Sequence, residues 1–364
     1  MKILIATPIN RPAGGITRWG KDLSRYCKSH PLSKTEVVFY AMDRSTLIGP
    51  YLSPFSRLYL GIKEYVSHCL GIIKVFQSHK PDVFHLTSSA SISLLKDLIL
   101  GFVSKSLNIK CVIHFHFGRI PQIKQANGLE WKLLKLVAKI FDHIIVLDNY
   151  SYQSLNSSGI HNISIVANPI DCAIVDSTSV ERHVSNRKEV LFVGHVIEAK
   201  GIFELVEVCQ SIPDIQLKLI GPVTSETRKQ VEQIVAEPQR LIIQGELPNE
   251  QIMEAMKSCS IFALPSHSEG FPYVILESMA CGCAIVTTNV GAISKMLEED
   301  KNGAYGIVVE PKNVTELRDA IAYMLNHPDF ADECRNNARQ RVKERYSMES
   351  VCSQLTSIWK GIVS

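Results

Sequence analysis

The chain has 364 residues, of which 46% are hydrophobic and 21% are charged. This length and apolar content exclude a disordered protein and a single small module, and they favour two domains of about 100–200 residues each. The net charge of +3 hides an asymmetry, because residues 1–170 carry 20 Lys and Arg against 9 Asp and Glu, whereas the remainder carries 19 against 27. A basic first half favours contact with a polyanion, either a nucleic acid or an anionic membrane surface.

The first apolar run, residues 2–7, is much shorter than the apolar core of a secretory signal peptide, so we expect a cytoplasmic protein. The longer apolar stretches at 92–103 and 133–146 are interrupted by charged residues. They fall short of the about 20 residues that a membrane span requires, so we expect none. The ten cysteines are scattered without metal-ligand spacing, which is typical of reduced, buried thiols.

Short β-rich apolar runs alternate with helical patterns along the whole chain. The first series of predicted strands is 2–7, 37–40, 83–86, 111–115 and 144–147. The second series is 189–194, 216–221, 241–244, 261–265, 284–288 and 306–309. This rhythm predicts an α/β protein with two doubly wound parallel sheets. The polar segment 168–188 between the two series is the predicted hinge.

Residues 261–297 carry the most informative loop. The pattern predicts a strand ending at Pro265, a loop, a helix whose first residue is Pro272, and a left-handed helix end at Gly282. The helix N-terminus, formed by Gly270, Phe271, Pro272 and Tyr273, can bind anionic oxygens beyond the sheet. Glu269 precedes this helix and Glu277 lies within it, and each carboxylate can accept two hydroxyl groups of a sugar. On spacing alone, two such glutamates are more typical of a solvated helix.

The string S-x-S-E-G-F-P-x-V-x-L-E-S-M-A-C-G, however, resembles the signature of the retaining GT-B glycosyltransferases of family four, which includes many bacterial polysaccharide and lipid-glycan transferases. Glu269 and Glu277 match its E-x7-E motif. The resemblance implies two Rossmann-like domains that face a central cleft. It implies an acceptor-binding domain at 1–170, a nucleotide-sugar-binding domain at 171–340, and a helical segment at 341–364 that crosses back to the first domain.

The resemblance extends over nearly the whole chain. Gly14 and Gly15 stand in the place of a glycine-rich loop after the first strand, and His116 aligns with a histidine near the donor sugar. Gly194 allows close approach of the backbone in the phosphate loop, and Lys200 has the position of the diphosphate-binding lysine. His195 departs from the family pattern, because many members have arginine there. Arginine is always charged whereas histidine is partly neutral near pH 7, so either His195 is protonated by the diphosphate or Arg11 or Arg18 replaces it.

Departure of a nucleoside diphosphate builds negative charge that fixed positive groups or a metal must stabilise. The sequence has no Asp-x-Asp motif, and the resemblance implies retaining, metal-independent transfer with no cofactor besides the nucleotide-sugar donor. It assigns Glu277 to the ribose, Glu269 to hydroxyls of the donor sugar, and Lys200 to the diphosphate. His116 positions the sugar, although a packed histidine at a strand end is the plainer alternative. His114 lies on the same strand face as His116, two residues earlier. On spacing alone these two histidines could bind a metal ion, which is the less favoured hypothesis.

The excess of positive charge in the first half of the chain indicates what kind of acceptor the protein uses. Residues 129–141 place Lys132, Lys135 and Lys139 on one helical face beside apolar residues, and residues 57–80 carry further lysines. Such helices are typical of contact with an anionic bilayer, or of a sheet-packing helix with a solvated outer face. We therefore expect a glycan or lipid-linked acceptor, reached at the inner face of the cytoplasmic membrane.

Four other functions would fit parts of this sequence. A nucleotide-sugar epimerase or a soluble-acceptor synthase would share the GT-B motifs. An NAD-dependent oxidoreductase fits the α/β rhythm but requires G-x-G-x-x-G after the first strand, and RPAGGITRWG lacks it. A nucleic-acid-binding protein fits the basic half, but no motif interleaves aromatic and basic residues.

Overall fold

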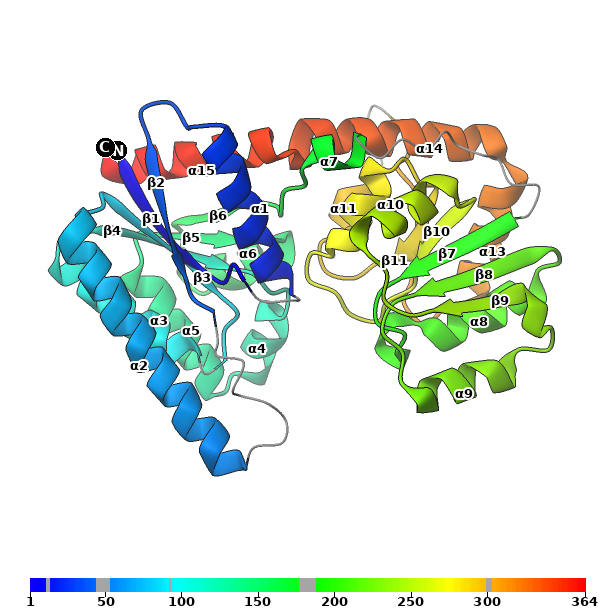
Figure 1. Cartoon of the computed structure of the whole chain (residues 1–364), viewed down its shortest axis with the longest axis horizontal. Coiled ribbons are helices and arrows are strands. Elements are labelled where there is room, and N and C mark those ends of the chain that lie inside the picture. Colours follow the sequence, from blue (N-terminus) through cyan, green and yellow to red (C-terminus); the bar gives the residue numbers. More distant parts are fainter. Residues whose placement is uncertain (11–13, 44–52, 92, 177–187, 299–302) are drawn as a thin grey trace. The chain divides into compact units, whose positions relative to one another are not determined.

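The computed structural model describes residues 1–10, 14–43, 53–91, 93–176, 188–298 and 303–364 (Figure 1). The chain divides into two compact units, one formed by Met1–Asn168 with Val351–Ser364 and the other by Pro169–Ser350. Part of the predicted hinge, 177–187, and Arg11 lie outside the described residues. Within the described residues, no helix combines the length and apolar character that crossing a membrane requires.

The first unit is built around a six-stranded parallel sheet with strand order β2-β1-β3-β4-β5-β6. Its strands are β1 (Lys2–Thr7), β2 (Glu36–Ala41), β3 (Val83–Ser88), β4 (Lys110–Phe115), β5 (His143–Val146) and β6 (Ile163–Ile165). Its helices are α1 (Gly15–Ser29), α2 (Pro54–His79), α3 (Ser93–Ser106), α4 (Ile120–Ala126), α5 (Leu129–Ile140) and α6 (Asn149–Asn156). The strands carry continuous apolar runs because helices cover both faces of such a sheet.

The second unit repeats this architecture with strand order β12-β11-β10-β7-β8-β9. Its strands are β7 (Lys188–Val193), β8 (Ile215–Ile220), β9 (Leu241–Gln244), β10 (Ile261–Leu264), β11 (Ile285–Thr288) and β12 (Ile307–Val309). Its helices include α7 (Cys172–Asp176), α8 (Ile202–Ser211), α9 (Ser225–Ile234), α10 (Asn249–Ser258), α11 (Tyr273–Ala280), α12 (Ile293–Leu297), α13 (Val314–Asn326) and α14 (Pro328–Arg341). The prediction of two doubly wound parallel sheets is confirmed.

The last helix, α15 (Met348–Val363), begins in the second unit and continues as part of the first. Trp359 is fully buried there, and its indole Nε1 donates a hydrogen bond of 3.1 Å to Nδ1 of His85 in β3. Burial of an indole with its N–H bonded provides a large apolar contact without leaving a polar group unpaired. The C-terminal residues are therefore part of the core of the first unit.

Helix α5 packs into the core of the first unit. Trp131, Leu134 and Val137 are buried, whereas Lys132 and Lys139 are exposed. Because these three side chains pack in the protein interior, they cannot contact a bilayer. For this face of the helix, the alternative of a helix that packs on the sheet is correct.

Candidate active site

Each sheet has a point where the strand order reverses, and ligands of open α/β sheets bind beyond the carboxyl ends of the strands at such points. In the second unit, β7 and β10 are adjacent at this reversal. The loop after β7 leads into a short 3₁₀ helix at Glu198–Lys200. The loop after β10 begins at Pro265, and the backbone N–H of His267 donates to the carbonyl of Ala199 at 3.0 Å. The two loops are therefore bonded directly to one another.

An ion pair lies where these loops meet. Nζ of Lys200 is 2.6 Å from Oε1 of Glu269, and the same carboxylate oxygen accepts a 2.8 Å hydrogen bond from the Ser266 hydroxyl. The two charged side chains are 25% and 10% exposed, so a ligand can still reach them. A lysine held beside a carboxylate presents both a donor for anionic oxygens and an acceptor for hydroxyl groups.

Glycines make this close approach of loops possible. Gly201 follows Lys200 with φ +70°, and a Cβ there would lie 2.0 Å from the carbonyl oxygen of Pro265. Gly221, with φ +138°, would place a Cβ 2.1 Å from the carbonyl oxygen of Gly194. A side chain at either position would push two backbone segments apart. Gly194 itself has φ +152°, and the next residue, His195, is exposed to solvent.

Helix α11 differs in detail from the prediction. The predicted first helical residue, Pro272, has the extended angles φ −75° and ψ 120°, and the helix begins at Tyr273. Proline fits both positions because its missing N–H has no helical partner at either. The helix ends as predicted, with Gly282 at φ +69°. Gly270, Phe271 and Pro272 form the loop that enters the helix, and the carbonyl of Gly270 accepts from the N–H of Ala292 at 2.8 Å.

Glu277 lies in the middle of α11 and is only 5% exposed. A carboxylate so deeply buried is costly unless polar partners surround it. Its charge also helps to raise the pKa of the Cys281 thiol to about 12, although burial of that thiol is the larger cause. Glu277 is thus a buried carboxylate of this unit. The alternative that spacing alone favoured, a solvated glutamate on a helix surface, is wrong for this residue.

The remaining predicted residues lie in the first unit, where β1 and β3 are adjacent at the reversal of strand order. Gly14 caps α1 with φ +125°, Gly15 is the first residue of that helix, and His116 directly follows β4. These three residues line one pocket together with Thr17. The structure therefore groups the predicted residues into two sets, one in each unit.

His116 belongs to a cluster of aromatic rings. Its ring centroid is 3.9 Å from that of His114 and 4.9 Å from that of Trp19, and His85 lies 5.5 Å from His114. Burial and then the influence of His85 lower the pKa of His116 to about 3, while a hydrogen bond to Asn168 acts in the opposite direction. The imidazole is therefore neutral at physiological pH. Within the described part of the chain, no three His, Cys, Asp or Glu side chains come together as metal ligands.

Sequence reasoning missed several residues that shape the site in the second unit. Ser266 bonds Glu269, and Nε2 of His267 lies 2.7 Å from Oε1 of Glu204 in α8. Gly291, with φ +56°, would place a Cβ 2.3 Å from the carbonyl oxygen of Glu269. A glycine in a loop shortly after a strand was the available signal for Gly291, whereas the contact of His267 with Glu204 spans 63 residues of sequence and gave none.

Two units, each built on a six-stranded parallel sheet with candidate site residues where the strand order reverses, have the architecture of the GT-B fold. Residues 176–341 match the family model of the glycosyl transferases group 1, and residues 13–174 match that of Glycosyltransferase Family 4. Together the two matches span most of the chain, and the protein belongs to the glycosyltransferases that these two models describe.

Individual relatives are distant. An uncharacterised glycosyltransferase of Methanocaldococcus jannaschii is 27% identical over all of this chain and 99% of its own. The capsular polysaccharide biosynthesis glycosyltransferase CapM of Staphylococcus aureus is 26% identical over 46% of this chain and 44% of its own. The chain spans about half the length of most curated relatives that it matches. The crystal structure of Anabaena HepE in complex with UDP has a TM-score of 0.73 at 16% identity, covering 99% of this chain and all of HepE.

Proposed function

We propose that this enzyme transfers a sugar from a UDP- or GDP-sugar to a glycan or lipid-linked acceptor in bacterial surface-polysaccharide assembly. The observation that carries the proposal is the Lys200–Glu269 pair at the reversal point of the second sheet. The UDP in the HepE complex and the polysaccharide role in the name of CapM support the donor and the pathway.

The donor roles are those that the resemblance to the family implies, and the charge and placement of these residues support them. Lys200 holds the leaving diphosphate, and Glu269 accepts hydroxyl groups of the donor sugar. The loop Gly270–Tyr273 and the backbone of Gly194 and His195 contact the nucleotide, and Glu277 accepts the ribose hydroxyls. Fixed positive groups of this kind stabilise a departing diphosphate without a divalent cation. We therefore propose that the reaction needs no metal ion. The resemblance to the family implies that it also retains the anomeric configuration of the sugar.

In the first unit, the start of α1 at Gly14 and Gly15 offers a site for anionic oxygens such as those of a phosphate. Unpaired N–H groups at a helix N-terminus favour anionic oxygens. His116 contacts the donor sugar as a neutral imidazole, because its pKa is lowered to about 3. A neutral ring can donate one hydrogen bond and accept another, which suits sugar hydroxyls.

We place the enzyme in the cytoplasm with peripheral contact to the membrane through α2, α3 and α5, which pack side by side with α3 between the other two (Figure 1). Among the described residues of these helices, the large exposed apolar side chains are Tyr59, Ile62, Val66, Leu70, Leu95, Ile99, Phe102, Leu129 and Leu136. The exposed lysines among the described residues of these helices are Lys63, Lys74, Lys105, Lys132 and Lys139. A broad apolar surface that also carries lysines is suited to anionic lipid, and it lies in the basic half of the chain.

Binding of nucleotides tests the donor proposal. UDP, GDP and ADP, each with and without its common sugars, are titrated calorimetrically into the wild type and Glu277→Gln, with and without EDTA. We expect one nucleotide to bind equally well with EDTA, and Glu277→Gln to weaken it about tenfold through loss of a charged hydrogen bond. Glu207→Gln, an exposed carboxylate on α8, is the matched control and should bind normally. The absence of binding by any nucleotide would contradict the donor site.

The membrane contact has its own test. Full-length protein is mixed with vesicles of phosphatidylcholine alone or with phosphatidylglycerol, and bound protein is separated by flotation. We expect binding only to the anionic vesicles at low salt, and its loss when Ile99 and Phe102 are changed to Asn and Ser. Tyr323→Ser, a change of a similarly exposed aromatic residue on α13, is the control. Equal binding by the changed protein would exclude this surface.

A further inference from the structure

Two cysteines from opposite ends of the chain meet in the first unit. Cys27 lies near the C-terminal end of α1, and Cys352 lies in α15, directly after the residue at which that helix enters the first unit. Both are free thiols in this structure. The S–H of Cys352 donates a hydrogen bond to Sγ of Cys27, so the two sulfur atoms are in direct contact.

The packing of the two helices holds this contact in place. The rings of Trp19 in α1 and Trp359 in α15 both pack against His85, with centroid distances of 5.6 and 5.8 Å. Cys27 follows Trp19 by eight residues, and Cys352 precedes Trp359 by seven. Residues seven or eight apart lie on the same face of a helix, about two turns along its axis. The tryptophans and the cysteines thus give one antiparallel alignment of α1 with α15 (Figure 1).

The two thiols differ in exposure and in acidity. Cys27 is partly exposed, whereas Cys352 is 2% exposed. The hydrogen bond from Cys352 lowers the pKa of the Cys27 thiol, although burial acts in the opposite direction. The same hydrogen bond and burial raise the pKa of Cys352. By contrast, burial raises the pKa of Cys281, another partly exposed cysteine, to about 12. A thiolate is the reactive form of cysteine, so Cys27 is the better nucleophile.

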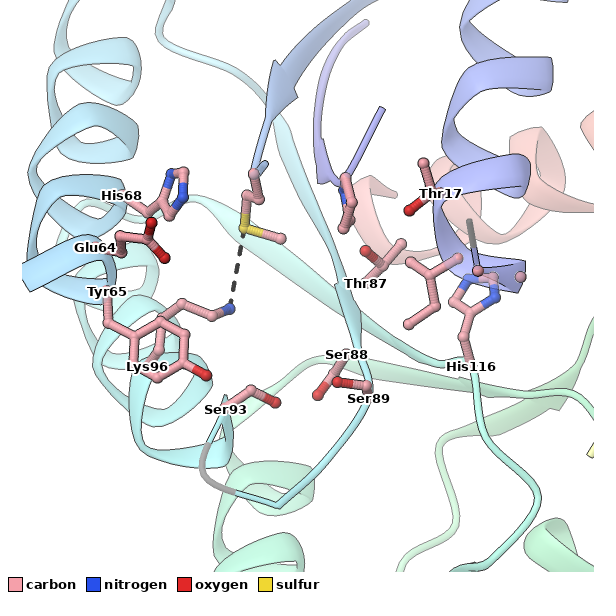
Figure 2. Close-up of a pocket in the computed structure, with 15 residues that line it drawn as sticks. Thr17, Glu64, Tyr65, His68, Thr87, Ser88, Ser89, Ser93, Lys96 and His116 are labelled. Atoms are coloured by element: carbon pink, nitrogen blue, oxygen red, sulfur yellow. Dashed lines mark hydrogen bonds between the residues drawn. The ribbon is translucent and has the colours of Figure 1, made fainter. Parts of the chain in front are cut away.

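The cysteine pair lies outside the candidate site. Figure 2 shows Thr17 of α1 and His116 beside the pocket of the first unit. Cys27 follows Thr17 by ten residues on the same helix, which places it about 15 Å further along the axis. Chemistry at Cys27 therefore leaves the pocket open, and it does not depend on the proposed transferase function.

We propose that Cys27 and Cys352 are an oxidation-sensitive pair that a hydroperoxide converts into a disulfide between α1 and α15. The Cys27 thiolate attacks one oxygen of the hydroperoxide and the O–O bond breaks. The second oxygen leaves as an alcohol, or as water from hydrogen peroxide, after it takes up the proton that Cys27 released. Cys27 is then a sulfenic acid.

The buried thiol completes the reaction. The sulfur of Cys352 attacks the sulfur of Cys27, the S–S bond forms, and the sulfenic oxygen leaves as water with the proton of Cys352. In total the two thiols lose two protons and two electrons, which the hydroperoxide accepts. The sulfur atoms already touch, so the S–S bond of about 2.05 Å requires a short further approach of the side chains. Thiol reductants reverse the step, as is typical of redox-sensing disulfides in reducing compartments.

Peptide mapping of the wild type is the direct test. Reduced full-length protein is treated with hydrogen peroxide at neutral pH, the remaining thiols are blocked with N-ethylmaleimide, and the peptides are analysed by mass spectrometry. We expect a cross-linked peptide that joins Cys27 to Cys352 and that dithiothreitol separates. Dimedone, which traps sulfenic acids, should label Cys27 about ten times faster than Cys281.

Variants test the order of the two steps. Cys352→Ser has no thiol to close the bond, so sulfenic acid on Cys27 should accumulate about tenfold above the wild type. Cys27→Ser should form no disulfide and leave the buried Cys352 unoxidised. Cys172→Ser, which changes another partly exposed cysteine, is the matched control and should form the disulfide normally. Thermal unfolding of the reduced proteins establishes that each variant is folded.

Stability measures whether the bond fastens α15 to α1. The disulfide closes a loop that contains most of the chain, so oxidation should raise the unfolding temperature of the wild type by about 5 °C and leave that of Cys27→Ser unchanged. Equal unfolding temperatures of the oxidised and reduced wild type would refute the tether. The whole inference is overturned if the oxidised wild type yields no peptide joining Cys27 to Cys352, or if Cys27 instead links two copies of the chain on a non-reducing gel.

Discussion

Lys200→Ala tests whether the lysine at the reversal point of the second sheet stabilises the leaving diphosphate. A hydrogen bond to a charged group contributes about 1.5–3 kcal/mol, so its loss in the transition state lowers kcat/KM by about 10- to 150-fold. Lys200→Arg keeps the charge and should retain part of the activity, because the wider guanidinium must fit beside Glu269, which is 2.6 Å from the lysine Nζ. Lys229→Ala, on the exposed face of α9, is the matched control.

The assay follows release of nucleoside diphosphate at several donor concentrations, so that kcat and KM are separated, and thermal unfolding checks the fold of each variant. Glu269→Gln adds a second prediction of opposite sign. In the ligand-free protein Glu269 forms an ion pair with Lys200. Glu269→Gln removes that competing charge, so the free nucleoside diphosphate should bind more tightly. Transfer should nevertheless slow, because the proposed contact of Glu269 with the donor sugar is lost. Full activity of Lys200→Ala in a folded protein would refute the role of the lysine.

Three further predictions concern other parts of the molecule. Gly201→Ala should lower the free energy of unfolding by at least about 1–3 kcal/mol in urea titrations, because φ is +70° and Cβ meets a backbone carbonyl, whereas Gly245→Ala, with open space around it, should be tolerated. Burial lowers the pKa of His85 to about 3, so the folded state disfavours protonation of this imidazole. The contribution of His85 to the free energy of unfolding is therefore fully present above the unfolded pKa of about 6.5 and declines as the pH falls towards 3. The expected loss between pH 7 and pH 5 is about 2 kcal/mol. Changing His114, whose pKa is also lowered by burial, to Phe should make this loss smaller, and an identical pH profile would contradict the argument. His195→Arg should keep or improve nucleotide-sugar affinity above pH 7 in calorimetric titrations, since the exposed side chain gains a permanent charge; a large loss there would assign the histidine another role.

Most strands could be predicted from the sequence because buried parallel strands are short, continuous apolar runs bounded by turn residues. The strand Ile163–Ile165 was missed, since a serine interrupts its apolar run, whereas the equally short strand Ile307–Val309 is apolar throughout. The helix was predicted to begin at Pro272, one residue too early, because proline fits equally well before and inside the first turn of a helix.

The placement of the candidate site residues was predictable where they lie within one stretch of sequence. Glu269, the glycine at the end of α11 and the entry loop all fall within residues 261–297. The contact of Lys200 with Glu269 spans 69 residues of sequence, and the cluster of His85, His114 and Trp359 joins β3, β4 and α15. Such contacts depend on which strands become neighbours, which periodicity does not specify.

The return of α15 to the first unit has a consequence for biosynthesis. Val351, Leu355 and Trp359 are fully buried, and they belong to a unit whose other residues end at Asn168. A ribosome must translate the whole second unit before these side chains exist, so the first unit emerges with the site for Trp359 beside His85 unfilled. We expect that the nascent first unit needs protection by chaperones until translation nears its end, and that chains stalled before residue 351 are recognised and degraded.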